Sequence, residues 1–206
     1  DGIYLGVAKR GVPCSEIHIK DVVCDNNHRQ GISVISAENL LIEDTIMRNT
    51  KGTAPQAGID FEPNAANERL VNCVMKNCVS EGNAGGAYAL YVVPLDGTSA
   101  PMSIRLENCT GSGGSYGLNL TTSNGGDGGS PRGTVEVVGC TFENTPGPGI
   151  SVTNVPAERM SVRFADCTVA HVASAQPSTT PITIASSGNA YDPVGNIEFD
   201  RCTVRD

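Results

Sequence analysis

Tryptophan is absent from this chain, and aromatic residues of all kinds make up only 4% of its 206 residues. No apolar run approaches the roughly 18 residues that a membrane-spanning helix needs, so we expect no membrane span. No segment keeps the 3.6-residue apolar period of an amphipathic helix. Glycine and proline are plentiful instead, with 24 and 12 residues. Together these features exclude a helical bundle and favour a turn-rich, all-β protein.

Positive charge is also scarce, because 14 Lys and Arg residues stand against 22 Asp and Glu, for a net charge of −8. Proteins that bind nucleic acid rely on basic patches, so we expect no nucleic-acid partner. An anionic polymer would need local cations or a metal ion to offset the repulsion.

Two short patterns recur along the whole chain. One is a small residue followed by apolar, any and apolar residues, and its copies start 27 to 32 residues apart, at residues 2, 31, 58, 87, 117, 149 and 181. The other is an apolar residue, any residue, a polar corner and a small residue, at 19–22, 42–45, 75–78, 106–109, 137–140, 164–167 and 199–202. Self-similarity at a fixed period predicts a solenoid. We therefore expect about seven coils of three parallel strands.

The repeat also predicts the domain organisation. One uniform period indicates that residues 1–206 form a single elongated domain. Solenoid ends need capping, and neither end of this chain offers an amphipathic cap. We therefore expect the chain to be a segment of a longer protein.

Five of the eight cysteines occupy one slot of the second pattern: Cys78, Cys109, Cys140, Cys167 and Cys202. Earlier copies place valine and threonine in the same slot, which indicates a packing position. We predict buried free thiols there rather than disulfides. The polar corners at Asp44, Asn77, Asn108 and Asp166 are predicted to be tight left-handed bends with side chains bonded to nearby backbone, because Asp and Asn tolerate that conformation.

Candidate functional residues lie on the strand at 58–61 and its neighbours. Alternate residues of a strand face opposite sides, so Ile59 and Phe61 are predicted to face the core and Asp60 and Glu62 the outer surface. Residues two apart on one face lie about 6.6 Å apart, which suits the carboxyl pair of either a retaining or an inverting glycosidase. Proximity of like charges would raise the pKa of one of them. An exposed Ile35 is expected beside the pair.

The corner sequences E-N-C-T at 107–110, D-C-T-V at 166–169 and R-C-T-V at 201–204, on this repeat, resemble those of the right-handed parallel β-helix proteins of the pectate-lyase-like superfamily. The resemblance covers essentially the whole chain. It implies an all-β, right-handed, single-stranded parallel β-helix, a polysaccharide partner, and a secreted or cell-surface location. The N-T-D, D-D and G-H-G motifs of polygalacturonases and the D-P-H motif of mannuronan epimerases are missing, which leaves the activity open.

Within this resemblance the first hypothesis is a glycoside hydrolase. Asp60 and Glu62 would be the acid and the base or nucleophile, while His28 and Arg29 would position the substrate. The sugar-binding surface would be formed by Tyr4, Tyr91, Ser33 and Asn64.

Two alternatives stay open. One is a calcium-assisted polysaccharide lyase or uronan epimerase, in which Arg29 or His28 abstracts a proton and Asp60 and Glu62 hold the calcium ion. The other is a non-catalytic segment of the adhesin or spike type that binds glycan or acts as a spacer. The sequence predicts no oligomeric state.

Overall fold

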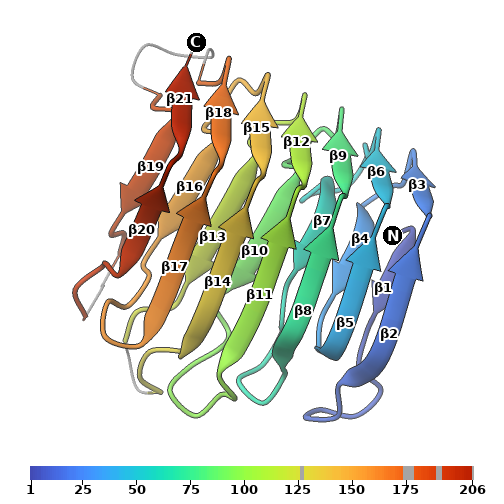
Figure 1. The fold of residues 1–206 in the computed structure, drawn as a ribbon. Helices are drawn as coiled ribbons and strands as arrows, with labels where there is room; N and C mark the ends of the chain where they lie inside the picture. The colour runs from blue at the N-terminus through green and yellow to red at the C-terminus, as the bar shows by residue number, and fades with distance from the viewer. Residues whose placement is uncertain (126–127, 174–178, 189–191, 206) are drawn as a thin grey trace.

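The computed structural model describes residues 1–125, 128–173, 179–188 and 192–205. This part of the chain contains 21 β-strands and no helix. The strands form three sheets of seven strands each, and every pairing between them is parallel. Successive strands pass from sheet A to sheet B to sheet C, and each coil adds one strand to every sheet (Figure 1). The predicted solenoid of about seven coils is confirmed.

Sheet A contains the candidate carboxylates. Its strands are β1 (Ile3–Leu5), β4 (Gln30–Val34), β7 (Ala57–Phe61), β10 (Tyr88–Val92), β13 (Leu118–Thr122), β16 (Ile150–Thr153) and β19 (Ile182–Ala185). Sheet B consists of β2 (Cys14–Lys20), β5 (Ala37–Glu43), β8 (Leu70–Lys76), β11 (Met102–Glu107), β14 (Gly133–Val138), β17 (Met160–Ala165) and β20 (Ile197–Asp200). Sheet C consists of β3 (Val23–Asp25), β6 (Ile46–Arg48), β9 (Val79–Glu81), β12 (Thr110–Ser112), β15 (Thr141–Glu143), β18 (Thr168–Ala170) and β21 (Thr203–Arg205).

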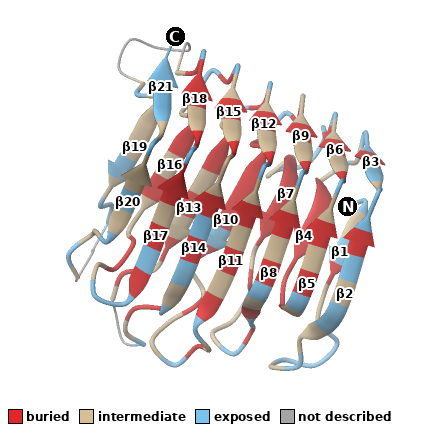
Figure 2. Cartoon of the chain, viewed as in Figure 1, coloured by how far each residue is buried: buried red, intermediate tan, exposed pale blue. Residues whose placement is uncertain are grey.

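The register of sheet A follows the predicted alternation. Ile32 of β4 pairs with Ile59 of β7, and Ser33 pairs with Asp60. The side chains of Ile32, Ile59 and Phe61 are fully buried in the core between the sheets. Figure 2 shows β4 and β7 buried along their length. A slip of one residue would exchange the two faces, so this apolar core sets the register.

The polar corners between sheets B and C adopt the predicted left-handed backbone. Asp44, Asn77, Asn108 and Asp166 have φ values of 52°, 51°, 53° and 55°. The predicted bonds from these side chains to nearby backbone are replaced by bonds between coils. The Nδ2 of Asn77 donates to the Oδ1 of Asp44 over 3.1 Å. Stacking brings equivalent side chains closer to one another than to free backbone groups, so a polar ladder forms.

All eight cysteines are free thiols, as predicted. Four of the five slot cysteines are buried, and Cys202 in the last coil is half-buried. Their thiols donate to backbone carbonyls, for example from Cys78 to Lys76 over 3.2 Å. Burial raises the pKa of Cys167 to about 11. Such thiols are packing groups with little thiolate character.

Membrane spanning by a helix finds no support in the structure. None of the described residues belongs to a helix long and apolar enough to cross a bilayer.

Candidate functional site

Asp60 lies on the outer face of sheet A, between Ser33 of the preceding coil and Ala89 of the next. That placement agrees with the predicted register. Its surroundings are more closed than the sequence indicates, because Asp60 is only 2% exposed and Ser33 is fully buried. The outer face of this coil is therefore covered by other side chains.

Part of the cover comes from Gln30, which is fully buried at the start of β4. Tyr116, which precedes β13, covers another part. Its ring lies directly against Gly86, where a Cβ atom would collide with it. Burial and then the charge of Asp60 raise the pKa of Tyr116 to about 12, which places the phenol near the carboxyl group. Gly86 thus permits a ring from the fifth coil to approach a carboxyl group of the third.

A ring of polar contacts links Asp60 to Glu62. The Nε2 of Gln30 donates to Asp60 Oδ2 over 2.8 Å. The Nη1 of Arg29 donates to the Oε1 of Gln30 over 2.9 Å, and its Nη2 donates to Glu62 Oε2 over 3.0 Å. Glu62 directly follows β7 and stands two residues from Asp60, which closes the ring. One guanidinium group therefore orients both carboxyl groups, one directly and the other through Gln30.

The two carboxyl groups have different electrostatic surroundings. Burial and the neighbouring Glu62 carboxylate raise the pKa of Asp60 to about 7, against the opposing effects of the Gln30 hydrogen bond and the Arg29 charge. Glu62 is more open, with 30% of its side chain exposed, and it is ion-paired with Arg29. Near neutral pH the site therefore contains a carboxylic acid that can give up its proton, next to a carboxylate held by a cation.

Two buried oxygen atoms in this site have no hydrogen-bond partner. They are Asp60 Oδ1 and Ser33 Oγ, which stand on adjacent rungs of sheet A. An unpaired buried polar group costs about 1–3 kcal/mol. Atoms of this kind mark positions where a proton, a water molecule or a ligand group completes the bonding.

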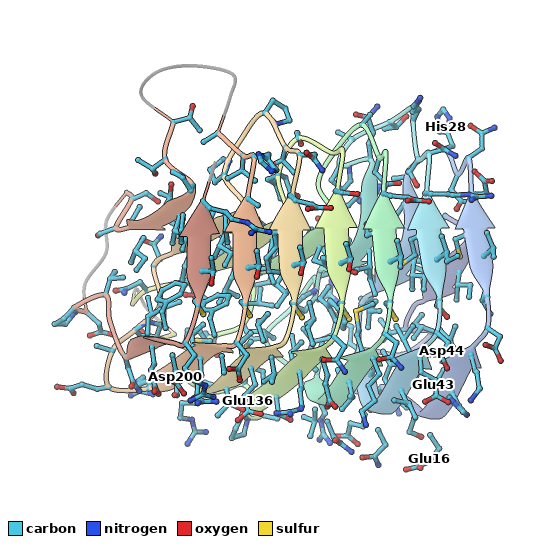
Figure 3. All side chains as sticks on the ribbon, turned by 45° about the horizontal axis from the view of Figure 1, so that its top comes forward. Glu16, His28, Glu43, Asp44, Glu136 and Asp200 are labelled. Carbon is cyan, nitrogen blue, oxygen red and sulfur yellow. The ribbon has the colours of Figure 1, made fainter. Side chains whose placement is uncertain are left out.

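His28 is not part of this ring. The residue follows β3 and is exposed. A nitrogen of its ring lies 3.0 Å from Thr53 Oγ1 in the next coil. Figure 3 shows it at the N-terminal end of the solenoid, beyond the tip of β3. The structure thus brings Arg29 to the carboxyl pair and leaves its neighbour His28 in a turn.

The predicted sugar-binding residues are dispersed around the pair. Tyr4 and Tyr91 are 58% and 44% exposed on the outer face of sheet A, and Tyr4 pairs with the buried Ser33. Asn64 lies exposed in the turn after β7, where its backbone nitrogen donates to Glu68. Ile35 is only 3% exposed, so the prediction of an exposed isoleucine is wrong. The first coil pairs beside it, with Ile35 N donating to Leu5 O over 3.0 Å.

Gln30 and Tyr116 were not predicted as site residues. Both directly precede a small residue that starts the first repeated pattern, so they share one column of the solenoid. The residues between them in that column are Ala57 and Gly86. A polar and an aromatic side chain at the two ends of a column of small residues was the available signal.

The carboxyl pair does not fit a calcium ion as it is arranged. Calcium takes six to eight oxygen ligands, whereas Asp60 Oδ2 and Glu62 Oε2 are engaged by Gln30 and Arg29. Nowhere in the described part of the chain do three or more His, Cys, Asp or Glu residues gather as metal ligands.

Comparison with known proteins places the fold. Residues 6–203 match a family described as a right-handed β-helix region. No curated protein matches the chain. One similar solved structure is a trypsin-treated form of QnrB1, a plasmid-mediated fluoroquinolone resistance protein. The two are 10% identical, the match covers 89% of this chain and 91% of that one, and the TM-score is 0.17, too low to support any inference. The repeat, the three parallel sheets and the match to almost every residue agree, and the chain belongs to the right-handed β-helix family.

Proposed function

We propose that this protein is a polysaccharide-active enzyme that hydrolyses a glycosidic bond, with Asp60 and Glu62 as the acid–base pair. The observation that carries the proposal is the buried Asp60, whose pKa is raised to about 7 beside the Arg29-paired Glu62. Two neighbouring carboxyl groups with different surroundings are the arrangement that divides the acid and base roles in glycosidases.

In this proposal each residue has a distinct task. Asp60 donates its proton to the leaving glycosidic oxygen, and Glu62 acts as the base for water or as the nucleophile. Arg29 orients Glu62, while Gln30 orients Asp60 through one hydrogen bond. Tyr4 and Tyr91 offer exposed ring faces to sugars.

Access to Asp60 requires a local rearrangement. The carboxyl group is covered in the structure, so substrate reaches it only when the Arg29–Glu62 ion pair or the Tyr116 ring moves aside. Both carboxylate and guanidinium of that ion pair are partly exposed, with side-chain exposures of 30% and 37%. Such a pair contributes little stability, and the hydroxyl groups of a sugar can replace its contacts. His28, Ser33 and Asn64 are proposed to act as outlying substrate contacts.

A panel of neutral and acidic polysaccharides tests the proposal. New reducing ends without ultraviolet absorbance indicate hydrolysis. Absorbance from an unsaturated uronate would instead indicate a lyase and overturn the hydrolytic assignment. The Glu62→Gln variant is the control, because residual activity in it would come from a contaminant or from another site.

The closure of Asp60 favours one further candidate, a non-catalytic β-helix that binds glycan on the outer face of sheet A. An acid that is 2% exposed is also what a buried structural cluster would contain. Under this alternative the panel shows binding without cleavage, and Tyr91→Ala weakens that binding while Asp60→Asn leaves it unchanged.

A further inference from the structure

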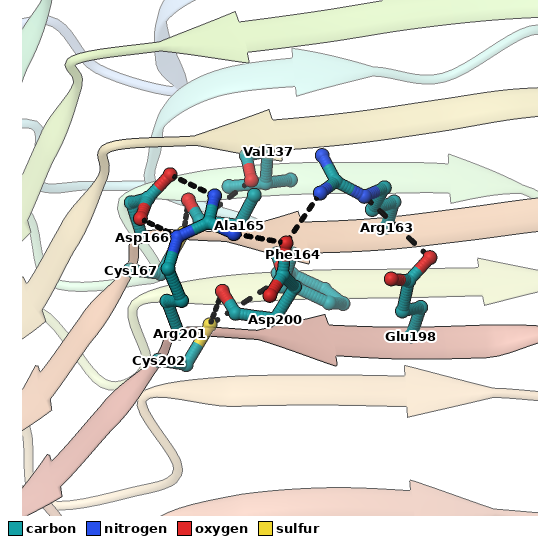
Figure 4. A network of polar contacts seen from close by, with 10 residues as sticks. All are labelled: Val137, Arg163, Phe164, Ala165, Asp166, Cys167, Glu198, Asp200, Arg201 and Cys202. Carbon is teal, nitrogen blue, oxygen red and sulfur yellow. Dashed lines mark hydrogen bonds and ion pairs between the residues drawn. The ribbon is translucent and has the colours of Figure 1, made fainter.

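Charges on the outer face of sheet B alternate in sign from strand to strand. In one column the paired residues are Lys20, Glu43, Lys76 and Glu107, and in the next they are Arg105, Glu136, Arg163 and Glu198. Lys20 and Glu43 approach to 2.9 Å, and Arg163 lies 3.5 Å from Glu198. Figure 4 shows Arg163 between Glu198 and Asp200, beside the Arg201–Asp166 pair. Opposite charges on adjacent rungs stabilise a sheet, so the cations here are neutralised.

The loop edge between sheets A and B departs from this pattern. Arg132 and Arg159 directly precede β14 and β17 and occupy equivalent positions in successive coils. Their carbonyl groups accept hydrogen bonds from Met102 and Gly133 at 2.9 and 3.2 Å. Adjacent rungs lie about 4.8 Å apart. Two like charges are therefore stacked at this edge, the lower edge in Figure 1.

Neither arginine is neutralised by a described residue. Both are exposed, and within residues 1–125, 128–173, 179–188 and 192–205 neither forms an ion pair. Glu158 and Asp192 share a cavity with Arg159 without pairing with it, and the Asp192 carboxylate accepts a hydrogen bond from Ser130. Like charges on neighbouring rungs are destabilising. A chain with 22 acidic residues has many alternatives to this arrangement.

A groove of about 380 Å³ lies on the same edge, with Arg132 on one wall and Arg69 on another. Arg69 is neutralised by Glu38 at 2.7 Å, so Arg132 supplies the open charge. Thr98 and Ser99 line the groove between them. Ser99 Oγ donates to the carbonyl of Ala66 over 2.6 Å, which joins the loops of two coils. The groove is therefore preformed.

We propose that Arg132, Arg159 and this groove form a binding site for an acidic glycan, a sugar chain that carries carboxylate or sulfate groups. Guanidinium groups bind such oxyanions through paired hydrogen bonds. The Thr98 and Asn67 side chains that line the groove suit sugar hydroxyl groups. No aromatic ring lines it, and single-stranded nucleic acids depend on aromatic stacking. The site is separate from the carboxyl pair and does not depend on the hydrolytic function.

Binding of four fluorescent probes to the full chain tests the site. The probes are an oligogalacturonate, a sulfated dextran oligomer, uncharged dextran and a single-stranded DNA oligomer. We expect binding of at least one acidic glycan, weakening as salt rises. Arg132→Gln or Arg159→Gln should weaken it about tenfold or more, the loss that follows removal of a charged hydrogen-bonding group. The preferred acidic probe distinguishes carboxylate from sulfate.

Arg163→Gln is the matched control, because it removes the same charge from the neutralised face of sheet B. Its affinity should stay within about twofold of the unmodified protein, since long-range charge effects are screened. The inference is overturned if Arg163→Gln is as harmful as Arg132→Gln, if uncharged dextran binds equally well, or if neither acidic glycan binds. Tighter binding of DNA would overturn the choice of glycan. The Asp60→Asn variant should bind normally, so a failure of the hydrolytic proposal is seen separately in the cleavage assay.

Discussion

At the scale of single residues, burial controls the charge of Asp60. Only 2% of the residue is exposed, and its pKa is raised to about 7 from an ordinary value of 3.8. Between these two values the folded state binds a proton that the unfolded state releases. Folding stability must therefore fall as pH rises through this range.

We expect the free energy of unfolding to decrease by on the order of 3 kcal/mol between pH 4 and pH 8, and Asp60→Asn to remove most of that decrease. Urea denaturation at several pH values measures it. The pKa values of Asp25, Glu43 and Asp166 are lowered by hydrogen bonds to Asn49, Lys20 and Arg201, respectively. Their stabilising effect is lost only below about pH 4, outside this window. An equal slope in both proteins would show that Asp60 is not buried as described.

The same residue is central to the proposed chemistry. Asp60→Asn and Glu62→Gln are each expected to lower turnover at least about 100-fold, because acid–base groups typically contribute 10²–10⁴. Glu198→Gln on the outer face of sheet B is the matched control and should retain full activity. Circular dichroism checks that the fold is intact. Undiminished turnover in both Asp60 and Glu62 variants would exclude the pair.

At the scale of elements, the left-handed corners determine how each strand of sheet B turns into sheet C. Asn108 has φ 53°, and the equivalent position of the next coil is Gly139 with φ 63°. Asparagine and glycine share this position because both tolerate a backbone that costs other residues about 1–2 kcal/mol.

Asn108→Leu should therefore lower the free energy of unfolding by about 1–2 kcal/mol, measured by urea denaturation. Asn108→Gly is the matched control, since it also removes the amide but accepts the positive φ. Its effect should be clearly smaller. Equal losses in the two variants would show that the amide, and not the backbone conformation, is what matters at the corner.

At the scale of the whole molecule, stacked coils place equivalent side chains in columns. The cysteine column lies inside the solenoid, and the thiols donate to backbone carbonyls such as those of Lys76 and Ala165. Their reactivity therefore depends on opening of the coils rather than on any single residue.

Thiol titration of the native protein should be slow for the four buried thiols of the column. After denaturation without reductant, all eight cysteines should react. The more open Cys14 and Cys202 should react first in the native state. A count below five after denaturation would mean that disulfides join the column.

The sequence by itself determined the repeat, the number of coils, the register of Ile59 and Phe61, the corners and the free thiols. Each follows from local rules that every coil repeats: alternation along a strand, a residue that tolerates positive φ, and a shared packing slot. It also placed Asp60 and Glu62 on one outer face next to Arg29.

Only the tertiary structure decided the rest of the candidate site. Gln30 reaches Asp60 from the preceding coil, and Tyr116 comes from two coils further on. The burial of Asp60 and Ile35, the outward turn of His28 and the stacking of Arg132 on Arg159 depend on loops that differ in length from coil to coil. A repeating pattern specifies what is common to the coils. The contacts made by unlike loops and by long side chains between coils exist only once the chain has been wound, and those contacts determine the charge and the exposure of the candidate site.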